Sequence, residues 1–227
     1  MTDRTSWAGK PYHPISLDYR QRFGSKVVKV PVSIADTCPN RMGLKGMQTC
    51  IFCDEHGSFA YAESQGLDLA KQIEEHRTKV ASRFNAAKFL IYFQAYTTTF
   101  TALGKLRHGF DLALGYDDVV GVVVGTRPDC LSDAVLRTWK EYSEKTFVAV
   151  EVGVQSFDDD QLTWMRRGHT GAQAIKGIER IAAEAGVDEP AVECRQVQPR
   201  RWRRHVEHRL ACRRPRGHLG VRHRPGH

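Results

Sequence analysis

The sequence lacks the features of membrane and exported proteins. No run of apolar residues approaches the ~18 that a membrane-spanning helix needs, so we expect no membrane span. The first residues, MTDRTSWAGKPYHP, contain no apolar stretch of the kind that forms the centre of a signal peptide. These two absences predict a cytoplasmic protein that is not associated with a membrane.

Acidic residues are nearly absent from the end of the chain. Residues 195–227 contain eleven Arg and five His but a single acid, Glu207. The other 194 residues hold 23 Lys and Arg against 25 Asp and Glu, so the formal net charge of +8 comes from this tail. The body is close to neutral, which excludes a broad basic surface for nucleic acid or membrane there.

The same tail lacks the residues that build a core. Residues 195–227 contain no Ile, Met, Phe or Tyr and show no hydrophobic periodicity. We expect disorder over 187–227, because such a segment cannot bury enough surface to offset the entropy of ordering it. Two interpretations stay open. The tail is a basic arm that binds RNA phosphates, or the sequence is truncated or frameshifted after about residue 186, since GC-rich codons encode Arg, Pro, His, Gly and Ala.

Apolar and amphipathic segments alternate four times in the preceding part of the chain. Short apolar or β-branched runs predict strands, and segments with apolar residues at spacings of three and four predict helices. The expected strands are residues 26–34, 88–96, 117–129 and 146–157, and the expected helices are 67–84, 98–113, 131–145 and 170–186. This alternation predicts parallel βαβ units, either an open α/β sheet or part of a barrel.

Four unusual segments begin where the predicted strands end. They are the cysteine-containing loop 36–56, FQAYTTTF, GTRPDC and GVQSF. Ligands of parallel α/β folds bind at the C-terminal ends of the strands. The sequence therefore predicts an active site at this edge, although it identifies no catalytic residue.

Cys38, Cys50 and Cys53 lie on the first of these loops. In a reducing compartment, clustered thiols are more typical of metal ligands or catalysts than of disulfides. Zinc takes four ligands, and His56 would complete a Cys-x2-Cys-x2-His pattern. Thiolates also hold iron–sulfur clusters, and three on one loop suit a 4Fe–4S cluster with one iron open to a small molecule. Spacing alone leaves these two sites, and unliganded thiols, as alternatives.

Residues 21–186 resemble a radical S-adenosylmethionine (SAM) family, the YhcC-like proteins. That family is related to the elongator catalytic subunit and, more distantly, to oxygen-independent coproporphyrinogen oxidase. The motifs that carry the resemblance are CPNR…GMQTCIFC, YFQAYTTTF, VGTRPDCLSDAVL and GVQSFDDDQLTWMRRGHT. Most radical SAM enzymes have three residues between the first two cysteines, and the longer gap here is this family's own variation.

The resemblance implies a function for the cysteine loop. Cys38, Cys50 and Cys53 would hold a 4Fe–4S cluster whose fourth iron binds SAM, with Phe52 packed near the adenine. Reductive cleavage of SAM would give a 5′-deoxyadenosyl radical that abstracts hydrogen from an unknown substrate. The cofactor supplies the chemistry, and the protein positions it.

The resemblance also implies four further SAM contacts. Gln155 and Arg167 match positions that contact SAM in the coproporphyrinogen oxidase group, and an Arg suits a carboxylate. Gln94 follows the second strand, where many relatives carry a Gly-Gly-Glu motif that is missing here. Glu151 is a candidate for the ribose hydroxyls. The alternatives are helix capping for Gln155 and Arg167, an ordinary polar residue at a strand end for Gln94, and a buried carboxylate for Glu151.

We therefore expect an N-terminal extension or lead-in helix over 1–26, a partial radical SAM (βα) barrel of about four of six units over 27–186, and the tail. The fourth strand is then an exposed edge of the sheet. Expected partners are the unknown substrate, with RNA as a candidate by analogy to the elongator subunit, and an electron donor such as flavodoxin or ferredoxin. The alternative functions are a zinc-dependent RNA-binding module that combines the cysteine loop with the Arg-rich tail, and an inactive truncated copy.

Overall fold

The computed structural model describes residues 14–64, 66–187, 189–193 and 220–222. The strands are β1 (Val27–Val32), β2 (Lys88–Phe93), β3 (Val119–Thr126), β4 (Phe147–Gly153), β5 (Glu189–Glu193) and β6 (Gly220–Arg222). The α-helices are α1 (Ile15–Phe23), α2 (Leu69–Phe84), α3 (Leu103–Leu114), α4 (Asp133–Ser143), α5 (Asp159–Trp164) and α6 (Gly171–Glu184). Short 3-10 turns are η2 (Leu44–Gly46), η3 (Ala62–Ser64) and η4 (Thr98–Phe100).

The strands form one parallel sheet in which the spatial order follows the chain, from β1 to β6. Helices α2, α3, α4 and α6 connect the first five strands, as parallel pairing requires a crossover. The four predicted strand–helix units are confirmed, and so is the α/β fold with the winding of a partial (βα) barrel. The predicted lead-in helix corresponds to α1, and residues 1–13 lie outside the described part of the chain.

The sheet continues beyond the four strands predicted from the sequence. β4 pairs in parallel with β5, and β5 with β6, so the prediction that β4 is an exposed edge is wrong. Both added strands fall within 187–227, where we expected disorder, and the rest of that tail lies outside the described residues. The β5 segment, EPAVE, contains a proline and two glutamates and lacks the apolar or β-branched run from which the other strands were predicted.

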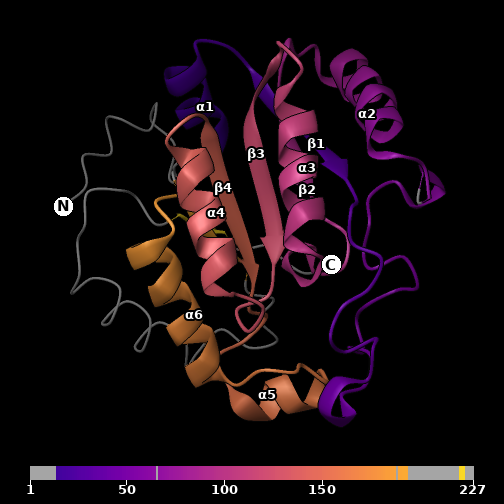
Figure 1. Ribbon diagram of the computed structural model, residues 1–227, viewed down its shortest axis with the longest axis vertical. Coiled ribbons are helices and arrows are strands. Elements are labelled where there is room, and N and C mark those ends of the chain that lie inside the picture. The colour runs from indigo at the N-terminus through magenta and orange to yellow at the C-terminus, as the bar shows by residue number, and fades with distance from the viewer. Residues whose placement is uncertain (1–13, 65, 188, 194–219, 223–227) are drawn as a thin grey trace.

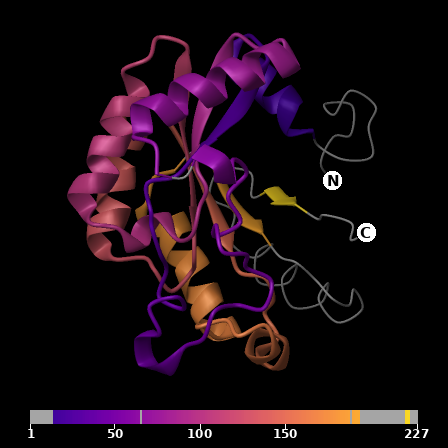
Figure 2. The same ribbon diagram turned by 90° about the vertical axis from the view of Figure 1, so that its right-hand side faces the viewer.

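One face of the sheet is covered by helices (Figures 1 and 2). Alternate strand residues such as Ile91, Phe93 and Val124 pack there against side chains of the helices, among them Ile73 and Trp139. This cluster is the main hydrophobic core, as the continuous apolar strands predict. Within the described ranges, no helix combines the length and apolarity needed to cross a membrane.

The opposite face is apolar at one end and polar at the other. Near the start of the strands, Tyr19 of α1 packs against Phe147 with ring centroids 5.9 Å apart, in a cluster that includes Leu90. Farther along, Lys29 of β1 forms an ion pair with Glu151 of β4. Because two strands lie between β1 and β4, this contact requires the sheet to curve toward that face. The curved face is therefore apolar near the start of the strands, at the cluster of Tyr19, Leu90 and Phe147, and polar toward their C-terminal ends.

Candidate active site at the C-terminal ends of the strands

The cysteine loop extends from β1 to the region of α5 at the C-terminal end of the sheet (Figures 1 and 2). Cys38 and Cys50 are buried, Cys53 is half-buried, and all three are free thiols. The backbone N–H of Ile51 donates to the carbonyl of Met165 at 3.3 Å. This bond joins the loop to the motif MRRGHT, more than one hundred residues away, so two of the predicted motifs meet as expected.

Two guanidinium groups donate to cysteine sulfurs. Arg41 Nη2 lies 3.6 Å from Cys53 Sγ, and Arg167 Nη1 lies 3.5 Å from Cys50 Sγ. Burial raises the pKa of the Cys53 thiol, and the positive charge of Arg41 opposes that shift. Cys38 and Cys50 contribute least to this pKa, and both raise it. Two cationic side chains therefore lie beside cysteine sulfurs, an arrangement that is typical of sites that stabilise thiolates.

Gln155 and Arg167 converge on Gly153 at the end of β4. Arg167 Nη2 donates to the Gly153 carbonyl at 2.6 Å, and a Cβ added to Gly153 would lie 3.3 Å from Gln155 Nε2. Gln155 has φ +73°, in the left-handed region that non-glycine residues seldom adopt. Strained backbone of this kind is concentrated at functional sites. The structure therefore brings together the two residues that the resemblance to the coproporphyrinogen oxidase group singled out.

Several buried polar atoms around this loop have no hydrogen-bond partner. Within the described part of the chain they include Gln155 Oε1, Arg167 Nε, Arg41 Nε and His169 Nε2. Buried polar groups in proteins are nearly always satisfied, and exceptions require an explanation. A polar ligand bound beside the thiols would supply partners for these groups.

The other predicted contact residues lie at three separate places. The guanidinium of Arg167 lies over the Phe52 ring, with its carbon 5.7 Å from the centroid. Gln94 Nε2 donates to the Ser58 carbonyl at 3.2 Å, so this side chain supports the segment after Cys53. Glu151 is paired with Lys29 lower on the curved face. Phe52 therefore shares the thiol environment, whereas Gln94 and Glu151 contact other parts of the fold, and their roles as SAM contacts stay predictions.

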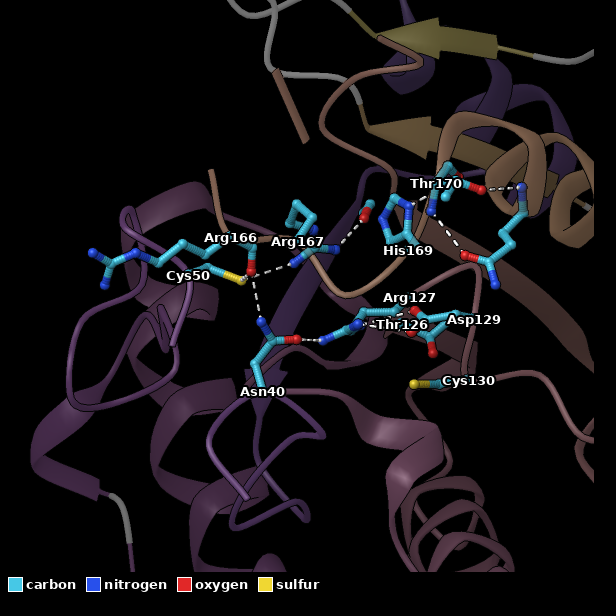
Figure 3. A network of polar contacts seen from close by, with 12 residues as sticks. Asn40, Cys50, Thr126, Arg127, Asp129, Cys130, Arg166, Arg167, His169 and Thr170 are labelled. Atoms are coloured by element: carbon cyan, nitrogen blue, oxygen red, sulfur yellow. Dashed lines mark hydrogen bonds and ion pairs between the residues drawn. The ribbon is translucent and has the colours of Figure 1, made fainter. Parts of the chain in front are cut away.

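The GTRPDC segment contributes a buried ion pair to the same edge. Arg127, which is 4% exposed, donates from Nε and Nη2 to the two carboxylate oxygens of Asp129 at 2.9 and 2.7 Å. Burial disfavours its charge, but the carboxylate outweighs that effect and raises the pKa of Arg127. Its remaining nitrogen donates to Asn40 of the cysteine loop (Figure 3). The pair thus connects β3 to the thiols.

His169 and Cys130 lie beside this network and stay uncharged at neutral pH. Burial, and then the charge of Arg167, lower the pKa of His169 to about 4. Burial, and then the charge of Asp129, raise the pKa of the Cys130 thiol to about 12. Neither group therefore adds charge to the site.

The zinc alternative depends on His56. The imidazole Nε2 lies 3.2 Å from a Glu55 carboxylate oxygen, on the segment that follows Cys53. Over the ranges described, no three His, Cys, Asp or Glu side chains, the three loop thiols included, are gathered so as to hold a metal ion, so this finding does not separate zinc from a cluster. The Arg-rich tail that the alternative also uses lies mostly outside those ranges.

Sequence reasoning missed three residues of this edge. Asn40 and Arg41 directly follow Cys38-Pro39, so their place beside the thiols was the one available signal. His169 is buried, and Arg167 and Asp129 both influence its pKa, although no motif spacing in the sequence singles it out. These roles depend on contacts between distant segments, which spacing does not encode.

A model of the radical SAM superfamily matches residues 32–192. The match runs beyond residue 186, where we expected the family pattern to stop. The chain is also 34% identical over 172 residues to YtqA of Bacillus subtilis (strain 168), covering 76% of this chain and 53% of that protein. It is 39% identical over 171 residues to YhcC of Escherichia coli (strain K12), covering 75% and 54%.

An archaeal protein, MJ0486 of Methanocaldococcus jannaschii, is 34% identical over 164 residues, covering 70% of this chain and 49% of that protein. The chain thus spans about half the length of the curated relatives it matches. Among solved structures, the archaeal Methanocaldococcus infernus Elp3 with N-terminus deletion (1-46) has a TM-score of 0.43 and 14% identity, covering 75% of this chain and 46% of that chain. A similarity of that size supports no conclusion about this protein.

Proposed function

The chain belongs to the radical SAM superfamily and is YhcC-like, and from that premise we propose that it is an iron–sulfur enzyme that cleaves SAM reductively. When bound, a 4Fe–4S cluster supplies the electron that cleaves SAM, and the resulting 5′-deoxyadenosyl radical abstracts hydrogen from the substrate. The observation that carries the proposal is the contact of Arg167 with Cys50 Sγ of the cysteine loop and with Gly153 beside Gln155, at the C-terminal end of a parallel sheet.

The residues of this edge fit such a centre in chemical type. Three thiols on one loop provide the sulfur ligands that iron–sulfur clusters take. Arg41 and Arg167 donate to two of the sulfurs, so cations are in place to offset the negative charge of thiolates. The unpartnered atoms of Gln155 and Arg167 leave one acceptor and one donor for a polar ligand.

We assign the protein residues these roles. Cys38, Cys50 and Cys53 hold the cluster as thiolates. Arg167, whose Nε is free of protein partners, and Gln155, whose Oε1 is, orient the polar groups of SAM. Phe52, whose ring centroid lies 5.7 Å from the Arg167 guanidinium carbon, packs near the adenine of SAM in this proposal. Gln94 and Glu151 serve the amino group and the ribose hydroxyls in this proposal.

The substrate, the electron donor and the location are part of the proposal. The body of the chain carries no net basic charge, so an RNA substrate would be bound through segments other than this domain's surface. We propose a flavodoxin or ferredoxin as the electron donor, because the cluster must be reduced by one electron. We propose the cytoplasm as the compartment, because free thiols persist in a reducing compartment.

The test is the formation of 5′-deoxyadenosine, measured by mass spectrometry after the anaerobically reconstituted protein is incubated with SAM and dithionite. We expect product from the wild-type chain and none from C38S, C50S or C53S. C130S is the matched control, because Cys130 is the fourth cysteine of the described residues and donates no ligand in the proposal. Loss of product in C130S, or product from C38S, C50S or C53S, would contradict the assignment.

A further inference from the structure

A buried amide joins the cysteine loop to the segment after α5. Asn40 lies two residues after Cys38 and is 2% exposed. Its Nδ2 donates to the carbonyl oxygens of Gln48 and Arg166, each at 2.6 Å. Its Oδ1 accepts from Arg127 (Figure 3). One side chain therefore links the loops that follow β1, β3 and α5.

The orientation of this amide is fixed by Arg127. A guanidinium has donors and no acceptor, so the oxygen of Asn40 must face it and the nitrogen must face the two carbonyls. Arg127 is itself held by both carboxylate oxygens of Asp129. The chain from Asp129 through Arg127 to Asn40 is consequently one rigid, directional set of hydrogen bonds.

The carbonyl that Asn40 holds belongs to a strained turn. Arg166 has φ +55°, a left-handed conformation that is unfavourable for a residue with a Cβ. Its carbonyl also lies 3.5 Å from Cys50 Sγ. A thiol can donate to that oxygen, but a metal-bound thiolate has no proton. Of these two donors, only Asn40 remains once Cys50 binds metal.

The turn sets the position of the next residue. Arg167 follows Arg166 directly and places Nη1 at 3.5 Å from Cys50 Sγ. Hydrogen bonds to the ligand sulfurs are among the features that set the reduction potential of an iron–sulfur cluster. A change in the turn at Arg166 would therefore move Arg167 away from Cys50 Sγ and change the reduction potential of the cluster.

We propose that Asn40 is a positioning residue for the cluster. Held by Arg127, it fixes the turn at Arg166 and keeps the Arg167 guanidinium on Cys50 Sγ, which raises the reduction potential of the centre. The inference rests on the proposed function, because it takes Cys50 as a cluster ligand.

Two substitutions separate the contacts of Asn40, and a second buried amide provides the control. Asn40→Leu removes the donors and the acceptor at similar volume, whereas Asn40→Asp keeps the acceptor for Arg127 and loses both donors. Gln72 is 3% exposed and donates to the carbonyls of Ser33 and Leu67 at 3.1 and 2.9 Å. Gln72→Leu therefore removes a matched pair of hydrogen bonds away from the thiols.

The first readout is the reduction potential of the reconstituted cluster, from a redox titration followed by electron paramagnetic resonance (EPR). We expect a lower potential in N40L and N40D and the wild-type value in Q72L, although all three lose thermal stability. R167M should also lower the potential, and N40L should add nothing in the R167M background, since coupled residues are not additive. An unchanged potential in N40L and N40D, or fully additive shifts, would overturn the proposal.

The second readout needs no cluster. Hydrogen–deuterium exchange of the metal-free chain should be faster in N40L and N40D over peptides covering 162–170, and unchanged there in Q72L. If the wild-type chain forms no cluster but the three variants show these differences in exchange, the proposed function fails and the role of Asn40 in holding the turn stands. If exchange over 162–170 does not respond, the turn is held by other contacts and the inference is wrong, whether or not a cluster forms. N40D carries both tests if N40L does not fold.

Discussion

At the scale of single residues, charge is arranged unevenly around the thiols. Arg41 and Arg167 donate to two cysteine sulfurs, and Arg127 is neutralised by its own carboxylate partner, Asp129. His169 lies beside the last two arginines and is 4% exposed. The positive charges of Arg41 and Arg167 therefore lie beside cysteine sulfurs, and the nearby imidazole of His169 is neutral.

The buried imidazole gives a pH-dependent stability. Burial and Arg167 lower the pKa of His169 to about 4 in the folded chain, whereas the unfolded value is ~6.5. Between these values the unfolded chain binds more protons than the folded chain. The contribution of His169 to the free energy of unfolding is therefore fully present above pH ~6.5 and is lost as the pH falls toward 4. The shift corresponds to about 3 kcal/mol. We expect urea unfolding at pH 7, 5.5 and 4.5 to show this loss.

The matched variants are H169N and H108N. Asn cannot ionise, so H169N should flatten the decline between pH 7 and 4.5, although burial also lowers the pKa of His76, which leaves part of the slope. His108 is exposed, and H108N should follow the wild-type curve. Equal slopes in H169N and the wild type would show that His169 is not buried as a neutral group.

Site residues that belong to a recognisable sequence motif could be predicted from the sequence. Gln155 and Arg167, which the resemblance singled out, do meet at Gly153, whereas the metal site predicted from the three cysteines stays a prediction. Asn40 could not be predicted in this way, because its role comes from carbonyls at positions 48 and 166 that folding brings together. A side chain that bonds backbone groups leaves no pattern in the sequence.

At the scale of elements, the position of α6 decides where the motif before it lies. Thr170 caps α6 and accepts from the backbone N–H of Gln173, directly after the RRGH segment. A Cβ added to Gly177, in the middle of α6, would lie 2.5 Å from the carbonyl oxygen of Pro128. The helix therefore packs closely on the GTRPDC loop, with no room for a side chain.

This close approach predicts a contrast between two glycines. G177A should destabilise the chain by about 1–3 kcal/mol, because the backbone of the Pro128 loop must move. Gly104 of α3 has open space around its Cβ position, and G104A should stabilise by about 0.5–1 kcal/mol. The check is the free energy of unfolding in urea. A G177A variant as stable as G104A would show that α6 does not approach the loop as described.

The sequence predicted elements better than it predicted their limits. Helices α2, α3, α4 and α6 were expected because each has an apolar face to cover the sheet. The short helix α5 was missed, since its start is defined by Asp158 accepting from the N–H groups of Asp160 and Gln161 rather than by an apolar pattern. β5 was missed because its sequence, EPAVE, has a proline and two glutamates in place of an apolar run.

At the scale of the whole molecule, the curvature of the sheet creates the site. The Lys29–Glu151 pair joins β1 to β4 across the curved face, with side chains 20% and 16% exposed. The ammonium of Lys29 also lies 5.1 Å from the Tyr92 ring centroid. The pair lies between the apolar cluster that includes Tyr19 of α1 and the polar edge that carries the thiols, and it connects β1 to β4.

Removing one partner of this pair should cost more than removing both. K29M leaves the Glu151 carboxylate without its Lys29 charge, and we expect a loss of roughly 2 kcal/mol, below the ~3–5 of a fully buried pair because both side chains keep some solvent contact. K29M/E151L should recover part of that loss. Urea unfolding measures both. A double variant no more stable than K29M would show that the ion pair is not the contact that matters.

The central claim is that three thiolates hold a 4Fe–4S cluster with one iron open to SAM. The most direct measurement is the EPR spectrum of the anaerobically reconstituted, dithionite-reduced protein, recorded with and without SAM. We predict a cluster signal whose shape changes when SAM is added, because SAM binds the iron that no cysteine holds. A colourless protein with one zinc ion per chain, or a cluster signal that is indifferent to SAM, would contradict the account.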